Sequence, residues 1–205
     1  MVIKVEVQES ILENTYFYID EKSHHGFLID PGAEANKILS LIQENGWVIE
    51  SILLTHGHFD HIGAVEDIRK TLSCEVLGYE GGDLYLLNPY YNLSSFFGEP
   101  IILDGVKKIN EKNEICLKSS RSFSLKVLHT PGHTKDSCVF YNDKVAFVGD
   151  TLFKNGVGNT SFPLGDEAEL WNSIKNKIFC LPESIVVYPG HGEDTLISIE
   201  KKRYQ

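Results

Sequence analysis

Short hydrophobic runs, rich in β-branched and aromatic residues, recur along the chain. The first, VIKVEV, alternates apolar and polar positions, a pattern typical of a strand with one buried face. Others, such as ILL, are continuous apolar runs. These runs predict strands over residues 2–7, 15–19, 27–29, 52–54, 75–77, 125–128, 139–141, 146–148 and 185–188.

Hydrophobic residues at helical spacing lie between some of these strands. Over residues 36–45, Ile38 and Ile42 share one face, and Gly46 follows as a residue that ends helices. The same spacing over residues 63–72 predicts a second helix.

A third helix has the clearest start. Asp166, with Glu169 three residues later, resembles a capping box, and Pro182 is predicted to mark the end of the helix. Residues 81–120 mix aromatic residues with Gly, Asn, Ser and Pro, so we expect a short helix and a long excursion there. The aromatic residues from Tyr85 to Phe97 are expected to pack in the core, with a lid or an oligomer surface as the alternative.

The order of these elements favours one fold class. Strands at the start, followed by strands alternating with helices, predict an α/β (α+β) protein with sheets flanked by helices, in preference to a barrel or a helical bundle. No repeat or linker interrupts the pattern. We therefore expect one domain over residues 1–205.

Composition narrows the functional classes. The chain has 19 basic and 29 acidic residues, a formal charge of −10, which disfavours nucleic acid and membrane surfaces as partners. Its 4 cysteines form no CxxC pair and are expected to be buried free thiols. The amino terminus lacks the apolar core of a secretory signal, so we expect a cytoplasmic protein.

The segment THGHFDH, residues 55–61, concentrates candidate metal ligands where a predicted strand ends. In an extended segment, His56, His58 and Asp60 project to one side, and His61 is offset at the turn into the next helix. Imidazole and carboxylate groups suit divalent metal ions. Several imidazoles packed together without a metal would repel one another when protonated, so the cluster predicts a metal site.

Further candidates follow other predicted strands, each in a loop that contains glycine or proline. They are His133 in LHTPGHT, Asp150 in AFVGDT and His191 in VVYPGHG. Loops held by a rigid scaffold are a usual place for functional residues. His129 is a nearby candidate for supporting a ligand. The residue types and their positions therefore mark candidate ligands but do not divide them between two metal ions.

These motifs resemble the metallo-β-lactamase-fold superfamily and, within it, the glyoxalase II-like hydrolases. The matching segments are THGHFDHIGA at 55–64, TPGHT at 130–134, GDTLF at 149–153 and PGHGEDT at 189–195, with ENTY at 13–16 and IDPG at 29–32 as weaker support. The resemblance spans nearly the whole chain. It implies a four-layer αββα sandwich with two metal ions at one edge.

The resemblance also divides the ligands between the two ions. It implies that His56, His58 and His133 bind the first ion, that Asp60, His61 and His191 bind the second, and that Asp150 bridges both. It places Asp30, in the IDPG loop, behind a ligating imidazole, where a carboxylate orients the ring; a simple Asp-Pro-Gly turn is the alternative. Zinc is the expected ion, although iron and manganese accept the same ligands.

Two such ions activate a bridging hydroxide and polarise an electrophilic oxygen, so hydrolysis is the expected reaction. The resemblance implies a thioester substrate, as for hydroxyacylglutathione hydrolases, with Asp60 and Asp150 as catalytic residues. The partner is then a small-molecule acyl thioester. No serine or cysteine nucleophile is required; Ser137 and Cys138 are expected to begin a strand.

Two features depart from glyoxalase II. Because 14 residues follow His191, we expect no counterpart of the helical domain that helps those enzymes to hold glutathione, and Asn159 stands where relatives commonly carry a basic residue. Asn159 therefore lacks the positive charge of a cationic substrate contact. Asn159 and Lys154 are candidate substrate contacts, and Lys135 can also supply a positive charge.

Alternative activities remain open. Persulfide dioxygenases look similar over the same length but hold a single iron with residues that match His56, His133 and Asp150. Lactones and phosphodiesters are within reach of the same metal-activated water. Metal counting combined with oxygen uptake separates the oxidative alternative from hydrolysis, because hydrolysis consumes no oxygen.

Overall fold

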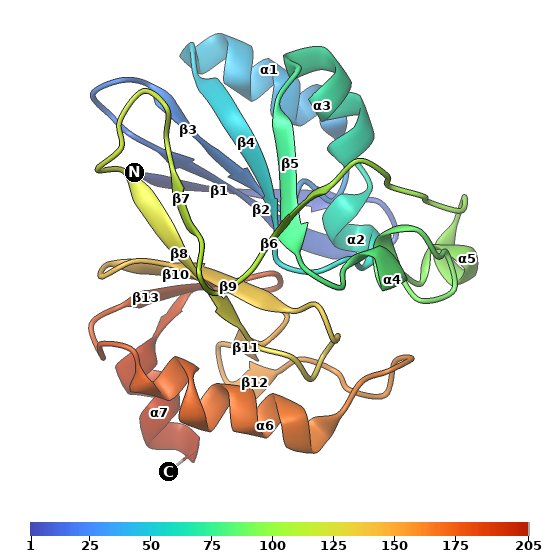
Figure 1. Ribbon diagram of the computed structural model, residues 1–205, viewed down its shortest axis with the longest axis vertical. Helices are drawn as coiled ribbons and strands as arrows, with labels where there is room; N and C mark the ends of the chain where they lie inside the picture. Colours follow the sequence, from blue (N-terminus) through green and yellow to red (C-terminus); the bar gives the residue numbers. More distant parts are fainter. Residues whose placement is uncertain (205) are drawn as a thin grey trace.

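The computed structural model describes residues 1–204, which form two β-sheets packed face to face with helices on both outer sides (Figure 1). The first sheet has the strand order β1-β2-β3-β4-β5-β6, and neighbours from β3 to β6 run parallel. Its strands are β1 (Val2–Gln8), β2 (Leu12–Ile19), β3 (His25–Ile29), β4 (Val48–Leu54), β5 (Glu75–Tyr79) and β6 (Lys107–Ile109).

The second sheet comes from the other half of the chain and has the order β14-β13-β10-β9-β8-β7. Its strands are β7 (Glu114–Cys116), β8 (Ser124–His129), β9 (Cys138–Tyr141), β10 (Val145–Gly149), β13 (Val186–Pro189) and β14 (Thr195–Leu196). Only β10 and β13 pair in parallel in this sheet. A separate hairpin joins β11 (Leu152–Phe153) to β12 (Gly156–Val157).

The helices form the outer layers and the connections near one edge. They are α1 (Ala35–Asn45), α2 (Phe59–Ile62), α3 (Val65–Leu72), α4 (Asp83–Leu86), α5 (Ser94–Phe97), α6 (Glu167–Asn176), the 3₁₀ helix η1 (Ile178–Cys180) and α7 (Ile197–Tyr204). In Figure 1, α1 and α3 lie above the first sheet, and α6 and α7 lie below the second. This arrangement is the predicted αββα sandwich.

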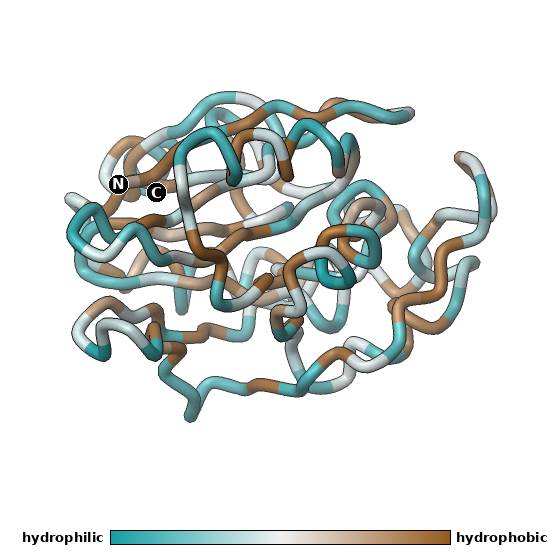
Figure 2. Tube along the Cα trace, turned by 90° about the horizontal axis from the view of Figure 1, so that it is seen from above, coloured by the Kyte–Doolittle hydropathy of each residue, from teal (hydrophilic) through white to brown (hydrophobic). Residues whose placement is uncertain are grey.

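The alternation of side chains along each strand separates the hydrophobic core into three layers. In β4, Ile52 and Leu54 pack with α1 and α3, whereas Leu53 faces the second sheet. In β10, Phe147 faces the first sheet, whereas Val148 packs against α6. Both faces of the central strands are therefore buried. Figure 2 shows that hydrophobic and hydrophilic segments follow each other along the chain.

Candidate ligands follow four strands directly. β4 ends at Leu54, β8 at His129, β10 at Gly149 and β13 at Pro189, and the loops after these ends carry the motifs singled out in the sequence. The two sheets thus contribute loops to one edge of the sandwich.

All nine predicted strands are present, with ends that differ by a few residues. The helix at 36–45 is confirmed, and Gly46 follows it with φ 63°. Asp166 caps α6 by accepting a hydrogen bond from the Glu169 amide at 2.9 Å. The end predicted at Pro182 was wrong, because α6 stops at Asn176 and the tighter turn η1 follows.

The stretch 81–120 contains more structure than predicted. It holds the short helices α4 and α5 and the three-residue strands β6 and β7. The expectation of buried thiols holds for Cys138 but was wrong for Cys116 and Cys180, which are exposed. Within residues 1–204, no helix combines the length and hydrophobicity needed to cross a bilayer.

Candidate metal centre

The loop after β4 changes conformation between its second and third candidate ligands. His58 is extended, with φ −70° and ψ 150°, and α2 begins at Phe59. The prediction of an extended segment was therefore wrong beyond His58, because Asp60 and His61 lie on a helical turn. One short loop still directs side chains at two neighbouring clusters.

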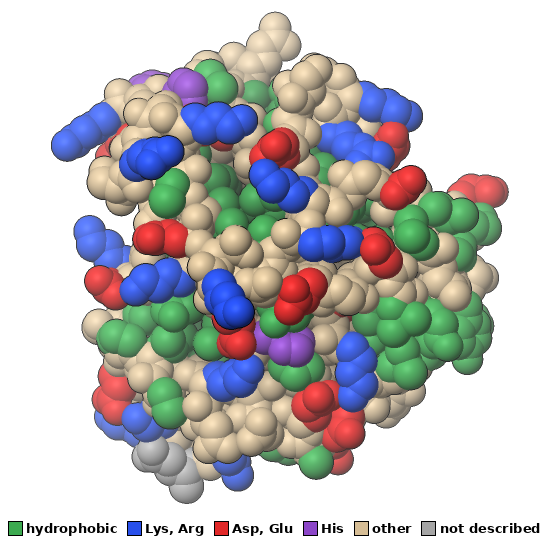
Figure 3. Space-filling model, viewed as in Figure 1, with side chains coloured by type: hydrophobic (Ala, Val, Ile, Leu, Met, Phe, Trp, Pro, Cys, Tyr) green, Lys and Arg blue, Asp and Glu red, His purple; other side chains and the backbone are tan. Residues whose placement is uncertain are grey.

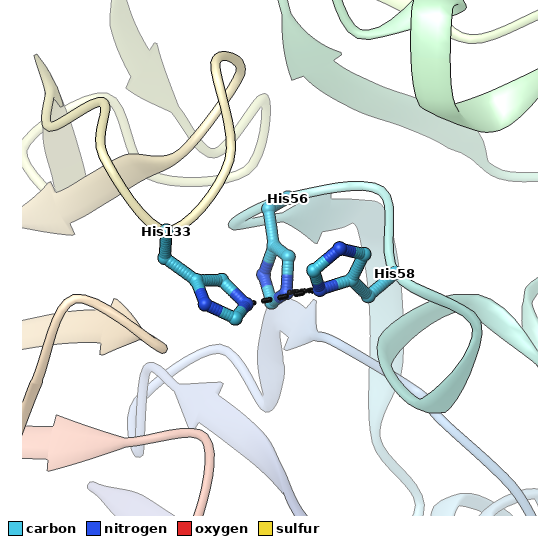
Figure 4. Close-up of side chains that lie close together, drawn as sticks. All are labelled: His56, His58 and His133. Carbon is cyan, nitrogen blue, oxygen red and sulfur yellow. Dashed lines mark hydrogen bonds between the residues drawn. The ribbon is translucent and has the colours of Figure 1, made fainter. Parts of the chain in front are cut away.

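Three imidazoles form the first cluster, at the ends of loops from both sheets (Figure 4). His58 Nδ1 lies 3.2 Å from His56 Nε2 and 2.9 Å from His133 Nε2. Two nitrogens bound to one tetrahedral ion at roughly 2.0–2.1 Å would lie about 3.3 Å apart. The spacing of these nitrogens matches that of ligands around a single metal ion.

The opposite ring nitrogens of His133 and His56 lie against neighbouring groups. His133 Nδ1 donates to the carbonyl oxygen of Asn159 at 2.7 Å, which leaves Nε2 of the neutral ring free to bind a metal. His56 Nδ1 lies 3.2 Å from Thr55 Oγ1. Burial lowers the pKa of His56, His58 and His133, and neighbouring histidines lower it further, so these rings are neutral and keep a lone pair for a metal.

The second cluster contains Asp60, His61 and His191. His191 Nε2 lies 3.3 Å from Asp60 Oδ2, and His61 Nε2 lies 3.9 Å from the same oxygen. These atoms are close enough to share one ion.

Asp150 lies between the two clusters. Its Oδ2 is 3.6 Å from His133 Nε2 and 3.4 Å from His191 Nε2, and its Oδ1 is 3.4 Å from His61 Nε2. A carboxylate in this position can contact ions held by either set of ligands.

Asp30 anchors the second cluster from behind. Its Oδ2 accepts from His61 Nδ1 at 3.0 Å and from Thr55 Oγ1 at 2.5 Å, and its Oδ1 accepts from the Thr55 amide at 2.7 Å. Asp30 itself has φ 47°, an uncommon conformation for a residue other than glycine. Asp30 therefore holds the His61 ring through this hydrogen bond, and no turn is assigned at residues 30–32.

Two residues that hold the His191 loop were not predicted as functional. His191 Nδ1 donates to the carbonyl oxygen of Leu12 at 2.7 Å. Asn14 donates from Nδ2 to the carbonyl oxygens of Pro189 at 3.0 Å and Gly192 at 2.9 Å. The sequence signal for Asn14 is its place in the ENTY segment at 13–16, which gave only weak support to the resemblance.

The second cluster carries paired charges. Burial opposes the charged form of His61, but Asp150 and Asp60 outweigh burial and raise its pKa well above the usual value. For His191, burial again opposes the charge, and Asp150 and Asp60 raise the pKa to about 10. Burial alone would raise the pKa of Asp150, but His61 and His191 hold it well below its usual range. In the metal-free protein, protons therefore balance the carboxylates.

Several buried atoms fit the binding of metal ions. Within residues 1–204, His61 Nε2 and Asp150 Oδ1, which face the clusters, are buried without a hydrogen-bond partner. A Cβ atom on Gly190 would lie 2.4 Å from Asp150 Oδ1 and 2.5 Å from His61 Cε1, so only glycine leaves this space open. The donor set and the space around it fit divalent metal ions.

Other predicted site residues lie outside these clusters. His129 stacks on Tyr79, with ring centroids 4.1 Å apart, and bonds the Lys135 carbonyl, so its assignment as support for a ligand was wrong. Lys154 is exposed and pairs with Glu193. Asn159 reaches the site through its carbonyl oxygen, while its side chain accepts from the Ser161 amide at 2.9 Å.

The aromatic segment 85–97 divides between core and surface. Tyr85 is fully buried, as predicted for core packing, but Tyr90, Phe96 and Phe97 are exposed by 53%, 60% and 43%. In Figure 3, hydrophobic side chains gather on the side of the molecule where α4 and α5 lie in Figure 1. Core packing was therefore wrong for these three residues.

Comparison with known proteins identifies the family. The sequence profile described as "Metallo-beta-lactamase superfamily" matches residues 12–191. The chain belongs to the metallo-beta-lactamase superfamily, and its fold and His/Asp clusters are those of a metallo-hydrolase.

Individual relatives agree with this assignment. Hydroxyacylglutathione hydrolase GloC of Haemophilus influenzae is 37% identical over 187 residues, which cover 89% of this chain and 86% of that protein. The crystal structure of BLEG-1 B3 metallo-beta-lactamase superposes with a TM-score of 0.90 at 33% identity, covering 98% and 97% of the two chains. TTHA1623, crystallised in a di-iron-bound form, superposes with a TM-score of 0.80 at 31% identity, covering 98% and 97%.

Proposed function

We propose that this chain is a metal-dependent hydrolase of acyl thioesters that holds two divalent ions. The observation that carries the proposal is the convergence of three neutral imidazoles on one point beside a second histidine and carboxylate cluster, with Asp150 between them. The buried His61 Nε2 and Asp150 Oδ1 atoms, which have no hydrogen-bond partner among residues 1–204, also support a metal site here.

The ligands divide into two sets with one shared member. His56, His58 and His133 hold the first ion, Asp60, His61 and His191 hold the second, and Asp150 contacts both. Zinc is our expected ion; iron and manganese accept the same ligands, and the di-iron form of TTHA1623 shows that a relative binds iron.

When bound, two such ions lower the pKa of a water molecule and polarise a carbonyl oxygen. The residues of the chain prepare the site for this chemistry. The Leu12 and Asn159 carbonyl oxygens fix the rings of His191 and His133. Burial opposes ionisation of Asp60, but His61 and His191 outweigh burial and lower its pKa. The carboxylate of Asp60 is therefore ionised and able to take a proton from the attacking water.

The proposal of a thioester substrate rests on a relative and on the type of reaction. GloC, at 37% identity, is a hydroxyacylglutathione hydrolase, which cleaves a thioester. A thiolate is a good leaving group, so attack by activated water at the acyl carbon suffices and no covalent enzyme intermediate is needed. We therefore place a small-molecule acyl thioester at the site.

The proposal is tested by metal counting and substrate screening. The purified protein is expected to hold two ions of zinc, iron or manganese per chain and to hydrolyse S-lactoylglutathione or another acyl thioester, with the thiol detected by a chromogenic disulfide. One iron per chain with oxygen uptake on glutathione persulfide would overturn the proposal in favour of a dioxygenase. Turnover of lactones or phosphodiesters alone would retain a hydrolase but reject the thioester.

Metal uptake by the second site is expected to depend on pH. The pKa values of His61 and His191 are raised, the latter to about 10, so both rings are protonated at pH 7 and must lose about two protons to bind an ion. The affinity for this ion should rise by up to about a hundredfold per pH unit above neutrality, since two protons compete with it. The first site, with lowered histidine pKa values, should release fewer protons.

Calorimetric titration of the metal-free protein with zinc, in buffers of different ionisation enthalpy, counts the released protons for each ion. Equal proton release at both sites would contradict this division of charge.

A further inference from the structure

The cavity that opens over the histidine clusters has an apolar wall. Candidate ligands line one side of it, and Ile11, Leu93, Phe97 and Phe162 line the other. The Phe162 ring lies edge-on to the rings of His58 and His133, with centroids 5.7 and 6.1 Å away. A group bonded to a carbonyl at the metal centre would therefore meet hydrocarbon surface.

Leu93 is fixed in this wall by an unusual backbone conformation. It has φ 70°, a region that bulky residues rarely adopt, and its side chain is buried. The preceding residue holds it in place: the Asn92 carbonyl oxygen accepts from the Phe59 amide at 2.9 Å, and Asn92 Nδ2 donates to the Ile101 carbonyl oxygen at 2.9 Å. Glycine would fit this backbone without strain but would leave no side chain in the cavity.

The charges around the cavity do not suit an anionic ligand. Within residues 1–204, no lysine or arginine lines it. Lys135 and Lys154, which the sequence suggested for an anionic substrate, are paired with Glu169 and Glu193. Glu99 borders the adjacent hollow that shares Phe97 with the cavity. The surroundings therefore offer no attraction to the carboxylates of a peptide thiol.

The cavity is also small. Its volume of about 170 Å³ is below the roughly 300–1,000 Å³ of pockets that enclose a whole drug-sized ligand. It has room for a compact group next to the carbonyl, while the rest of a thioester would extend over the rim.

From these observations we infer that the cavity binds a compact hydrocarbon acyl group, so the enzyme is selective for short apolar acyl thioesters over hydroxyacyl ones. The inference rests on the proposed thioester hydrolysis and adds the acyl class and the residues that select it. Leu93 and Phe162 are the specificity-determining side chains, because both lie in the apolar wall next to the reacting centre.

The test uses thioesters that differ only in the acyl group. For N-acetylcysteamine, a neutral thiol, kcat/KM is expected to rise about threefold to fourfold for each methylene from acetyl to butanoyl, and butanoyl should exceed lactoyl. The same acyl groups on glutathione should give no higher kcat/KM, since no lysine or arginine among the described residues lines the cavity.

Substitutions in the cavity wall test which side chains cause the dependence of kcat/KM on acyl length. Leu93→Gly keeps the backbone unstrained, and Phe162→Ala truncates a half-buried ring, so both are expected to fold and to lose most of the dependence on acyl length. Leu87→Ala, at an exposed leucine outside the cavity, is the matched control and should keep it. Circular dichroism confirms folding of each variant.

A second readout does not depend on turnover. The ketone analogues S-(2-oxopropyl)- and S-(2-oxopentyl)-N-acetylcysteamine cannot be hydrolysed, and the longer one should bind the metal-free protein about tenfold more tightly in calorimetry. The Leu93→Gly and Phe162→Ala variants should abolish that difference.

The outcomes separate the two proposals. If no thioester is hydrolysed by the metal-loaded protein, the proposed function is wrong, whereas the analogues still report on the cavity. If thioesters are hydrolysed with no dependence on acyl length, or with lactoyl preferred, the apolar acyl site is wrong and the proposed function stands.

Discussion

Asp150→Asn is expected to lower kcat/KM for a thioester by about a thousandfold, because the variant loses the carboxylate that lies between both ligand sets. The amide keeps the shape of the side chain but not its charge. The second ion should be lost first, since His61 and His191 then lack their main counter-charge. Metal content per chain and thioester turnover measure both effects.

The same substitution has a signature in the metal-free protein. Asp150 raises the pKa of His61 and His191, so removing its charge should lower both values. An NMR titration of the histidine ring protons reports this shift. Asp143→Asn, at an exposed aspartate, is the matched control. Full activity with two bound ions in Asp150→Asn would contradict the bridging role.

Gly190→Ala is expected to lower kcat/KM by about a hundredfold without removing any ligand. The added Cβ would lie 2.4 Å from Asp150 Oδ1 and 2.5 Å from His61 Cε1, so both side chains must move by about 1 Å, a displacement that costs on the order of a hundredfold at a reacting centre. Steady-state kinetics with zinc titration measure the loss of rate and affinity.

Gly156→Ala is the control for this substitution. Its Cβ would meet only Phe153 atoms at 3.9 Å, an ordinary contact, so activity should stay within about twofold of the wild type. If Gly190→Ala binds two ions normally and keeps its rate, the space around the two ligands is not as restricted as the geometry indicates.

The architecture was largely predictable because hydrophobic spacing follows secondary structure. The continuous run Ile52, Leu53 and Leu54 serves two core layers at once, which only a strand between two packed faces allows. Short elements escaped prediction: α2 and α5 span four residues each, too few for a helical period to appear. Cys116 lies on β7, a three-residue strand with a side open to solvent.

The candidate ligands could be nominated from the sequence because imidazoles and carboxylates followed strand ends in recognisable loops. Their supports could not, since the carbonyl oxygens of Leu12 and Asn159 belong to the backbone and leave no mark on residue type. The apolar wall around Leu93 was equally impossible to predict from the sequence. Its position depends on a left-handed backbone conformation that is set by hydrogen bonds to distant segments.

The loops of both sheets meet at the clusters, so metal binding there affects the stability of the whole molecule. An ion shared by His58 and His133 would act as a cross-link between the two halves of the chain, in addition to the hydrophobic packing and hydrogen bonds that join them. Its binding energy would then count toward resistance to unfolding, by about 2.7 kcal/mol at a free ion concentration 100 times the dissociation constant. The concentration of free metal ions would thereby set both the stability of the folded protein and its catalytic rate.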